Sequence, residues 1–225
     1  SYVRRSPRMT PSQRGWLDQY AARWVIPVAA ADHLATAVAP QPALDLQQVF
    51  GRTAPLVVEV GSGHGDTLAA AATARPDRDF LGFEVFEASL ASTLGKVAAA
   101  GSTNVRLVAA DAVTGLTHLL KDESVTELWV FFPDPWPKTR HHKRRLVTPA
   151  FAGLAARKLR PGGLIRLATD WSAYARAMAE TFDADDRFDC GGTARFAGRP
   201  VTKFEARGLA AGRTIHDLAY VKVAP

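Results

Sequence analysis

Three acidic side chains in this sequence lie where they could together bind a small ligand. Glu59 precedes the glycine-rich segment Gly61–Gly65, and Glu84 and Asp111 each end a later apolar run. Glycines in such a turn let a ligand approach the backbone closely. Glu84 is placed to accept hydrogen bonds from both hydroxyls of a ribose, and Asp111 to accept one from an adenine amino group. A ligand with an ammonium group, a ribose and an adenine but no phosphate therefore suits the three acids.

S-adenosylmethionine is such a ligand, and its sulfonium adds a further positive charge. A nicotinamide dinucleotide fits less well, because its fingerprint places a glycine where Asp66 stands and because Glu59 would repel a pyrophosphate. The plainer alternative is that the acids only cap helices or solvate strand ends. That alternative is the better one for any single acid, whereas three acids at successive strand ends favour a bound ligand.

A fourth acid, Asp134, lies in the segment Pro133–Trp136, just past a fourth apolar run. The two prolines fix the backbone on either side of it, which limits the entropy lost in ordering a site. The fourth run is expected to adjoin the glycine segment in the sheet, so we expect Asp134 to lie near the transferable methyl group. Trp136 would stack on a base or form a wall of the pocket. The alternative, a rigid turn with Trp136 in the core, is left open by the spacing alone.

Five lysines and arginines follow at once, within residues 138–145. Beside a pocket, such charges suit the phosphates that flank a target base, although a run of charge can also be only a solvated face. The neighbouring His141 and His142 do not indicate a metal site. Adjacent side chains point to different sides of an element, and no carboxylate or cysteine follows at ligand spacing. We therefore expect no metal.

The elements that would position these residues alternate between short apolar runs and helical stretches. The expected strands cover residues 56–60, 80–85, 104–111, 125–132, 164–169 and 214–223. This alternation predicts an α/β protein with a parallel sheet, helices on both faces and ligands at the carboxyl ends of the strands. Thr10-Pro11-Ser12 begins an earlier helix. We expect one domain overall, in which a basic arm and helices over residues 1–54 pack on a main part over residues 55–225.

Composition narrows the class of partner. The chain has 225 residues, of which 47% are hydrophobic, enough for a sizeable core. Its net charge of +6 suits an anionic partner, with nucleic acid as the leading candidate, and suits equally a basic enzyme that has no polyanion partner. The clustering of the charge is what favours the anionic partner. The single cysteine, Cys190, excludes an intramolecular disulfide and allows a reducing compartment. No apolar run has transmembrane length and no signal segment opens the chain, so we expect a cytoplasmic protein away from the membrane.

Two later stretches could line the same pocket. Asp170 ends the fifth expected strand, within Thr169-Asp170-Trp171, and Thr202-Lys203-Phe204-Glu205 precedes the last one. Each stretch also reads as a helix start, with Thr202 and Glu205 spaced as a capping box. Capping and substrate contact are compatible, because a capped helix presents its N-terminus to the pocket.

Taken together, these motifs closely resemble one family. The segments VEVGSGHG, FEV, AADA, FPDPWPKTRHHKRR, ATDW and TKFEARG are similar to those of the bacterial tRNA (guanine-N7-)-methyltransferases, and the resemblance covers nearly the whole chain. It implies a Rossmann-like class I methyltransferase fold with a mostly parallel seven-stranded sheet and an antiparallel last strand. It implies cofactor contacts at Glu59, Gly61, Gly63, Gly65, Glu84, Asp111, Ala112 and Asp134. The substrate contacts that it implies are Lys138, Asp170, Thr202, Lys203, Phe204 and Glu205. One departure is His142, which stands where relatives tend to have asparagine.

The resemblance implies that the chain methylates N7 of guanine 46 in the tRNA variable loop, leaving S-adenosylhomocysteine. Guanine N7 carries a lone pair and no proton, so no general base is needed. Asp134 is expected to stabilise the charge that moves to the purine. Alternatively, Asp134 or Asp170 accepts from the guanine N1–H and amino group. Candidates for the RNA backbone are Arg4, Arg5, Arg140, Lys143, Arg144 and Arg145.

Other classes remain as alternatives. A methyltransferase fold kept only to bind RNA would show an eroded cofactor site, whereas the acids and glycines are all present here. An enzyme acting on an exocyclic amine would also use an acidic, proline-rich and aromatic loop, but the Thr-Lys-Phe-Glu stretch argues against it. We expect tRNA as the partner, no obligatory protein partner, and a monomer or homodimer.

Overall fold

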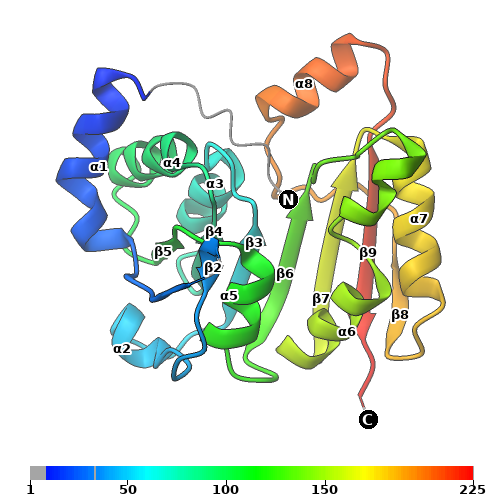
Figure 1. Cartoon of the computed structure of the whole chain (residues 1–225), viewed down its shortest axis with the longest axis horizontal. Helices are drawn as coiled ribbons and strands as arrows, with labels where there is room; N and C mark the ends of the chain where they lie inside the picture. Colours follow the sequence, from blue (N-terminus) through cyan, green and yellow to red (C-terminus); the bar gives the residue numbers. More distant parts are fainter. Residues whose placement is uncertain (1–8, 33, 225) are drawn as a thin grey trace. The chain divides into compact units, whose positions relative to one another are not determined.

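The computed structural model describes residues 9–32 and 34–224 (Figure 1). Its seven-stranded sheet has the order β5 (Val105–Val108), β4 (Asp79–Phe83), β3 (Leu56–Val60), β6 (Val125–Phe131), β7 (Leu159–Thr169), β9 (His216–Lys222) and β8 (Phe188–Gly192). The β3–β4, β4–β5 and β6–β7 pairs are parallel, and β9 is antiparallel to both β7 and β8. This order confirms the predicted α/β class, with a mostly parallel sheet and an antiparallel last strand.

The chain divides into two compact units after Lys121. The single domain with an arm and helices over residues 1–54, which the sequence predicts, stays a prediction. The first unit holds the glycine segment, and the second holds the Pro-Asp-Pro-Trp segment. We describe each unit by itself.

The first unit contains the strands β3, β4 and β5, with helices before, between and after them in the sequence. All five residues of β3 and of β4 are buried, as expected for parallel strands covered on both faces. Its helices are α1 (Pro11–Trp24), α2 (Leu46–Phe50), α3 (Asp66–Ala74), α4 (Glu87–Ala99) and α5 (Ala112–Leu119). A short antiparallel pair, β1 (Ala30–Ala31) and β2 (Leu34–Val38), was not predicted from the sequence.

Helix α1 begins at the predicted position and packs on α4. Thr10 and Gln13 form a reciprocal capping box, with a proline in the first turn. The Gln13 side-chain amide donates to the Ala88 carbonyl (3.1 Å) and to Ser92 Oγ (2.9 Å) on α4. The Trp16 ring lies so close to Gly95 that a Cβ there would approach it to 2.6 Å. These contacts attach the N-terminal helix to the first unit.

The second unit contains β6, β7, β9 and β8. Its helices are the 3-10 helix η1 (Thr139–Arg144), α6 (Pro149–Lys158), α7 (Ser172–Asp183) and α8 (Lys203–Ala210). The sequence predicts that Pro161-Gly162-Gly163 separates a helix from a strand beginning at Leu164. In the structure β7 already begins at Leu159, and the pairing with β6 shifts register across this segment. Strand β8 was also missed, because only its first residue is buried and it shows no apolar alternation.

Within the ranges that the structure describes, no helix is long and apolar enough to cross a membrane.

Candidate functional site

The glycine segment forms a tight turn between β3 and α3 in the first unit. Gly61, Gly63 and Gly65 all have positive φ, at 70°, 54° and 75°, a conformation that glycine adopts without strain. The turn closes on β4, because the Gly61 and Ser62 N–H groups both donate to the Phe83 carbonyl, at 2.9 and 3.0 Å. A Cβ at Gly65 would lie 2.4 Å from the Thr93 side chain. The segment therefore needs its glycines both for conformation and for close packing.

Glu84 holds this turn in place through its carboxylate. Oε2 accepts from the Gly63 N–H at 2.8 Å, and Oε1 accepts from the Val85 and Phe86 N–H groups at 2.7 and 2.9 Å. Burial raises the pKa of Glu84, and these three backbone donors act against that rise. Oε1 already accepts two bonds, so Oε2 is the better placed oxygen for a ribose hydroxyl. Contact with both hydroxyls stays a prediction.

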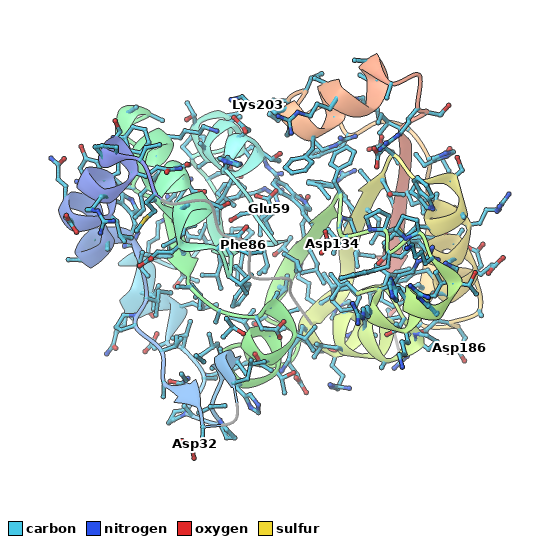
Figure 2. The ribbon with its side chains drawn as sticks, turned by 45° about the horizontal axis from the view of Figure 1, so that its top comes forward. Asp32, Glu59, Phe86, Asp134, Asp186 and Lys203 are labelled. Atoms are coloured by element: carbon cyan, nitrogen blue, oxygen red, sulfur yellow. The ribbon has the colours of Figure 1, made fainter. Side chains whose placement is uncertain are left out.

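Glu59 is the unusual acid of the first unit. It lies in β3 with 4% of its surface exposed, and its Oε2 has no hydrogen-bond partner in the part of the chain that the structure describes. Burial raises the pKa of Glu59 to about 8, and the nearby Glu84 and Asp66 raise it further. Figure 2 labels Glu59 and Phe86 in this unit. A buried, unpaired carboxylate beside other acids would be stabilised by a cationic ligand, so the residues fit the sulfonium-bearing cofactor expected from the sequence.

Asp111 and Ala112 lie at the start of α5. Asp111 is its N-cap, and its Oδ1 accepts from the Thr114 N–H at 3.0 Å. The helix-capping interpretation is thus confirmed for this acid. Ala112 is the first helical residue and is buried. The capping bond involves Oδ1, and an adenine contact through the other oxygen stays a prediction.

The Pro-Asp-Pro-Trp segment of the second unit is bounded by two aromatic residues with left-handed backbones. Phe132 has φ 52° and Trp136 has φ 42°, both rare for bulky side chains and costly. The turn is anchored by the Phe132 N–H, which donates to the Ala168 carbonyl at 2.8 Å. Asp134 lies between Phe132 and Trp136 in the sequence. It is exposed and forms no hydrogen bond or ion pair with any other described residue (Figure 2). The loop therefore presents one free carboxylate on a strained, fixed backbone.

Arg145 is less available for the predicted RNA contact than the other cations of the run. It is 8% exposed, its Nε donates to the Pro135 carbonyl at 3.0 Å, and its guanidinium lies 4.7 Å from the centre of the Tyr174 ring. Tyr174 in turn accepts from the Val147 N–H at 3.0 Å. A guanidinium that is buried in this way has little surface for a phosphate. We assign Arg145 to the support of the loop.

The other cations of the run remain available to an anionic partner. Lys138, Arg140, Lys143 and Arg144 are exposed on or beside η1. Arg144 lies over the Trp136 ring at 4.9 Å, and the His141 ring meets Trp136 edge-on at 5.9 Å. Trp136 therefore lies neither in the core nor fully in solvent, because Arg144 and His141 of η1 pack against its ring. Arg4 and Arg5 lie outside the described residues.

The expected substrate residues near α7 and α8 are brought into two different environments. Thr202 caps α8 by accepting from the Glu205 N–H at 3.2 Å, while Lys203 and Phe204 are exposed, Phe204 by 61% (Figure 2). Asp170 accepts from Arg213 Nη1 at 2.7 Å. It keeps only part of its carboxylate for any further contact.

Glu205 corrects the predicted capping box, while its predicted substrate contact stays a prediction. Its side chain does not complete a capping box, and with 2% exposure it has little surface for a substrate. Instead its oxygens bind Arg199 at 2.8 Å and Arg195 at 3.2 and 3.3 Å. Arg199 also binds Asp217. Sequence reasoning missed these arginines and Asp217, because no local spacing links residues that only the tertiary fold brings together.

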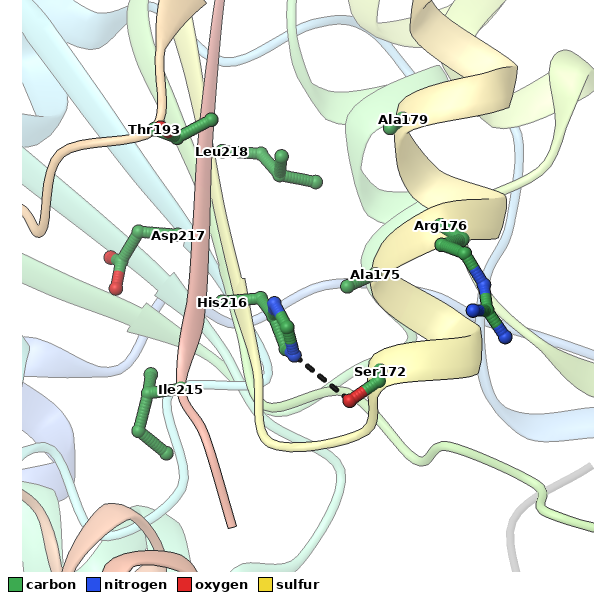
Figure 3. Close-up of a pocket in the computed structure, with 9 residues that line it drawn as sticks. All are labelled: Ser172, Ala175, Arg176, Ala179, Thr193, Ile215, His216, Asp217 and Leu218. Carbon is green, nitrogen blue, oxygen red and sulfur yellow. Dashed lines mark hydrogen bonds between the residues drawn. The ribbon is translucent and has the colours of Figure 1, made fainter.

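A cavity of about 600 Å³ in the second unit lies between α7 and β9 (Figure 3). Ser172 Oγ and His216 Nε2 approach to 3.0 Å there. Figure 3 shows the Asp217 side chain on the other side of β9, so this neighbouring acid does not extend the pair into a catalytic triad. None of the residues predicted to contact cofactor or substrate lines this cavity.

Comparisons with known proteins agree with these features. Residues 53–218 match a family described as "Putative methyltransferase". The tRNA (guanine-N(7)-)-methyltransferase of Cutibacterium acnes (strain DSM 16379 / KPA171202) is 52% identical over 99% of this chain and 83% of its own length. That of Halorhodospira halophila (strain DSM 244 / SL1) is 43% identical over 98% of this chain and 93% of its own.

Solved structures share the fold at low identity. The crystal structure of the 16S rRNA methyltransferase KamB matches with a TM-score of 0.59 at 18% identity, over 82% of this chain and 96% of that one. The antibiotic-resistance methyltransferase Kmr matches with a TM-score of 0.56 at 20% identity, over 85% and 98%. These likenesses show the class I methyltransferase fold. With the high identity to full-length relatives, they lead to one conclusion: the chain belongs to the family of tRNA (guanine-N7-)-methyltransferases.

Proposed function

We propose that this chain transfers a methyl group from S-adenosylmethionine to N7 of guanine at position 46 in the variable loop of tRNA. The products are 7-methylguanosine in the tRNA and S-adenosylhomocysteine. The observation that carries the proposal is the 52% identity, over 99% of the chain, to a protein named for guanine-N7 methylation of tRNA. The residues of the two units support it as follows.

The first unit supplies residues suited to the cofactor. When bound, S-adenosylmethionine supplies an electrophilic methyl group on a sulfonium. The unpaired Glu59 carboxylate compensates positive charge on the ligand, and Glu84 holds the glycine turn while offering Oε2 to a ribose hydroxyl. Asp111 offers the oxygen that does not cap α5 to the adenine amino group. A dinucleotide would instead bring a pyrophosphate to the buried Glu59, which its negative charge opposes.

The second unit supplies residues suited to the guanine. N7 needs no deprotonation, so the protein has to align the base and to stabilise the positive charge that develops on the purine. We assign the stabilising role to Asp134, because its carboxylate is exposed and forms no ion pair among the described residues. Asp170, which is held by Arg213, is the less available of the two acids considered for reading the guanine edge.

The exposed cations and one aromatic side chain suit the tRNA around that guanine. Lys138, Arg140, Lys143 and Arg144 form a basic helix next to Asp134 in the sequence, a position suited to the flanking phosphates. Phe204 is 61% exposed beside Lys203, a pairing suited to base stacking next to a phosphate. With these assignments, the exposed positive charges on and beside η1 bind the phosphates of the tRNA.

The test is to incubate the protein with S-adenosylmethionine and unmodified tRNA and to map the methylated base. We expect 7-methylguanine at position 46, and no methylation of a matched tRNA that carries adenine there. Methylation of an exocyclic amine, or of another position, would contradict the proposal. A protein that binds the tRNA and the cofactor without transfer would instead be an RNA-binding subunit.

A further inference from the structure

The second unit contains a buried arginine that joins two acids from different elements. Arg199 is 1% exposed. Its Nη1 donates to Glu205 Oε2 on α8 at 2.8 Å, and its Nη2 donates to both oxygens of Asp217 on β9, each at 2.8 Å. One rigid guanidinium therefore connects the first turn of α8 to β9, the strand that is antiparallel to both of its neighbours in the sheet.

The same guanidinium also reaches the base of the Pro-Asp-Pro-Trp loop. Its central carbon lies 5.4 Å from the centre of the Phe131 ring and 5.1 Å from that of Phe132. Phe132 is the left-handed residue that immediately precedes Pro133. Arg199 thus contacts α8, β9 and the end of β6 at once. Of these contacts, Phe132 immediately precedes the Pro133–Trp136 segment that carries Asp134, and Glu205 immediately follows Phe204.

Arrangements of this kind are often not the most stabilising way to fill an interior. Buried ion pairs are often matched or exceeded in stability by well-packed apolar residues of similar volume. In addition, the Nε of Arg199 is buried without a hydrogen-bond partner in the described ranges, which carries its own cost. A planar group with several fixed donors gives direction that an apolar side chain lacks. The network therefore points to a geometric role.

We propose that Arg199 is a positioning residue for methyl transfer, an inference that rests on the function proposed above. By holding Glu205 and Asp217 while packing on Phe131 and Phe132, it fixes the capped start of α8 relative to the Asp134 loop. Thr202 and Phe204 both lie shortly before Glu205 in the sequence, so they keep a set geometry toward Asp134 only while Arg199 is in place.

Arg195 provides a matched control. It also binds Glu205, at 3.2 and 3.3 Å, but its side chain is 41% exposed. Among the described residues it forms no ion pair with Asp217 and no cation–π contact with Phe131 or Phe132. Replacing Arg195 removes a contact to the same carboxylate without removing the connection between the elements.

The experiment measures methyl transfer in a single turnover, with enzyme in excess over tRNA, for Arg199→Lys and Arg195→Lys. A lysine keeps the charge but cannot span both carboxylates with a rigid fork. We expect Arg199→Lys to lower the rate constant by at least about tenfold, since small misplacements of reacting groups are costly. Arg195→Lys should stay within about threefold. Cofactor affinity should be unchanged in both. At a saturating excess of enzyme over tRNA, a partly unfolded sample leaves the rate constant unchanged as long as the folded enzyme still saturates the tRNA.

Glu205→Gln is the second variant, in case Arg199→Lys does not fold. It keeps the side-chain volume and weakens the same connection, so it should slow the single turnover as well. Hydrogen exchange of the amides in residues 203–210 gives a readout that does not depend on the reaction. Faster exchange in Arg199→Lys than in Arg195→Lys supports the positioning role even if the mapped product were a different base. Equal rate constants and equal exchange in the two variants would overturn it.

Discussion

Glu59 in the first unit and Glu205 in the second are almost equally buried, with 4% and 2% of their surfaces exposed, yet their surroundings are opposite. Glu205 binds two arginines, whereas Glu59 Oε2 has no partner among the residues described and burial raises its pKa to about 8. An acid that already has its counter-ions stabilises one arrangement of the chain. An acid that lacks them is costly until something positive binds. The contrast separates residues that serve the fold from residues that serve a ligand.

The same distinction holds within the second unit. Asp170 and Asp217 are bound by Arg213 and Arg199, whereas Asp134 forms no ion pair with another described residue and is exposed. Asp134 therefore resembles Glu59 in having its carboxylate free, although solvent covers it in the absence of a ligand. We therefore assign the free acids to ligand binding and chemistry, and the paired acids to support of the fold.

The largest expected effect is the loss of stability when an arginine that pairs with the buried acids is removed. Arg199→Met removes the closest partner of Glu205 and the arginine that pairs with the buried Asp217. Removing one member of a buried ion pair typically costs about 3–5 kcal/mol of stability. Arg195→Met, at a half-exposed position, should cost about 1 kcal/mol or less. Denaturant unfolding of the two variants measures the difference. Equal losses would mean that burial does not separate the two arginines.

Replacing the unpaired acid Glu59 should instead raise the free energy of unfolding. Glu59→Gln removes a buried charge that lacks a partner, so we expect the free energy of unfolding at pH 8 to rise while cofactor affinity falls. The loss of a charged hydrogen-bonding partner is worth about 1.5–3 kcal/mol, or roughly a 10- to 100-fold weaker Kd. Denaturant unfolding and a cofactor titration measure the two effects, with Glu205→Gln as the control. Weaker folding together with normal cofactor affinity in Glu59→Gln would contradict the assignment.

The pH dependence of stability gives a third test. The pKa of Glu59 is about 8 in the folded protein, against 4.5 ordinarily, so between these values the folded state holds a proton that the unfolded state has lost. The stability contributed by this group is complete below pH 4.5 and is lost as pH rises through about 8. We expect the difference in unfolding free energy between wild type and Glu59→Gln to change with pH between 4.5 and about 8, and to be independent of pH above that range. A difference that is constant with pH would contradict the raised pKa.

The smallest effects concern the basic helix. Lys143 is exposed and Arg145 is buried, so only Lys143 should contact phosphate. Lys143→Ala should lower the slope of log affinity for tRNA against log salt by about one and leave unfolding unchanged. Arg145→Ala should leave the slope unchanged and destabilise the protein. Titrations at several salt concentrations decide, and a reversal of the two results would place the buried cation on the RNA surface.

Local sequence signals predicted those features that depend on neighbouring residues. The strand at residues 56–60, the Thr10 helix start and the acid at the start of α5 follow from apolar runs and capping chemistry. Glu205 shows the limit of such signals. Its spacing from Thr202 predicts a capping box, but two arginines from elsewhere in the fold bind the carboxylate more strongly than a backbone N–H would.

The Arg199 network could not be predicted because it depends on tertiary register. Arg199 and Asp217 are 18 residues apart, and only the pairing of β9 with β7 brings the acid to the arginine. Arg145 and Lys143 are indistinguishable in sequence for a related reason. Two residues along a 3-10 helix and its cap are enough to move one cation from solvent onto the Tyr174 ring.

The most direct test of the account is methyl transfer by Asp134→Asn, with cofactor affinity measured separately on the same sample. The substitution keeps the shape of the side chain and removes its charge. If the free carboxylate stabilises the positive charge that develops on the guanine, the rate of 7-methylguanine formation should fall about 100-fold or more at saturating cofactor. Wild-type turnover by Asp134→Asn would contradict the central claim that the unpaired acids perform the chemistry.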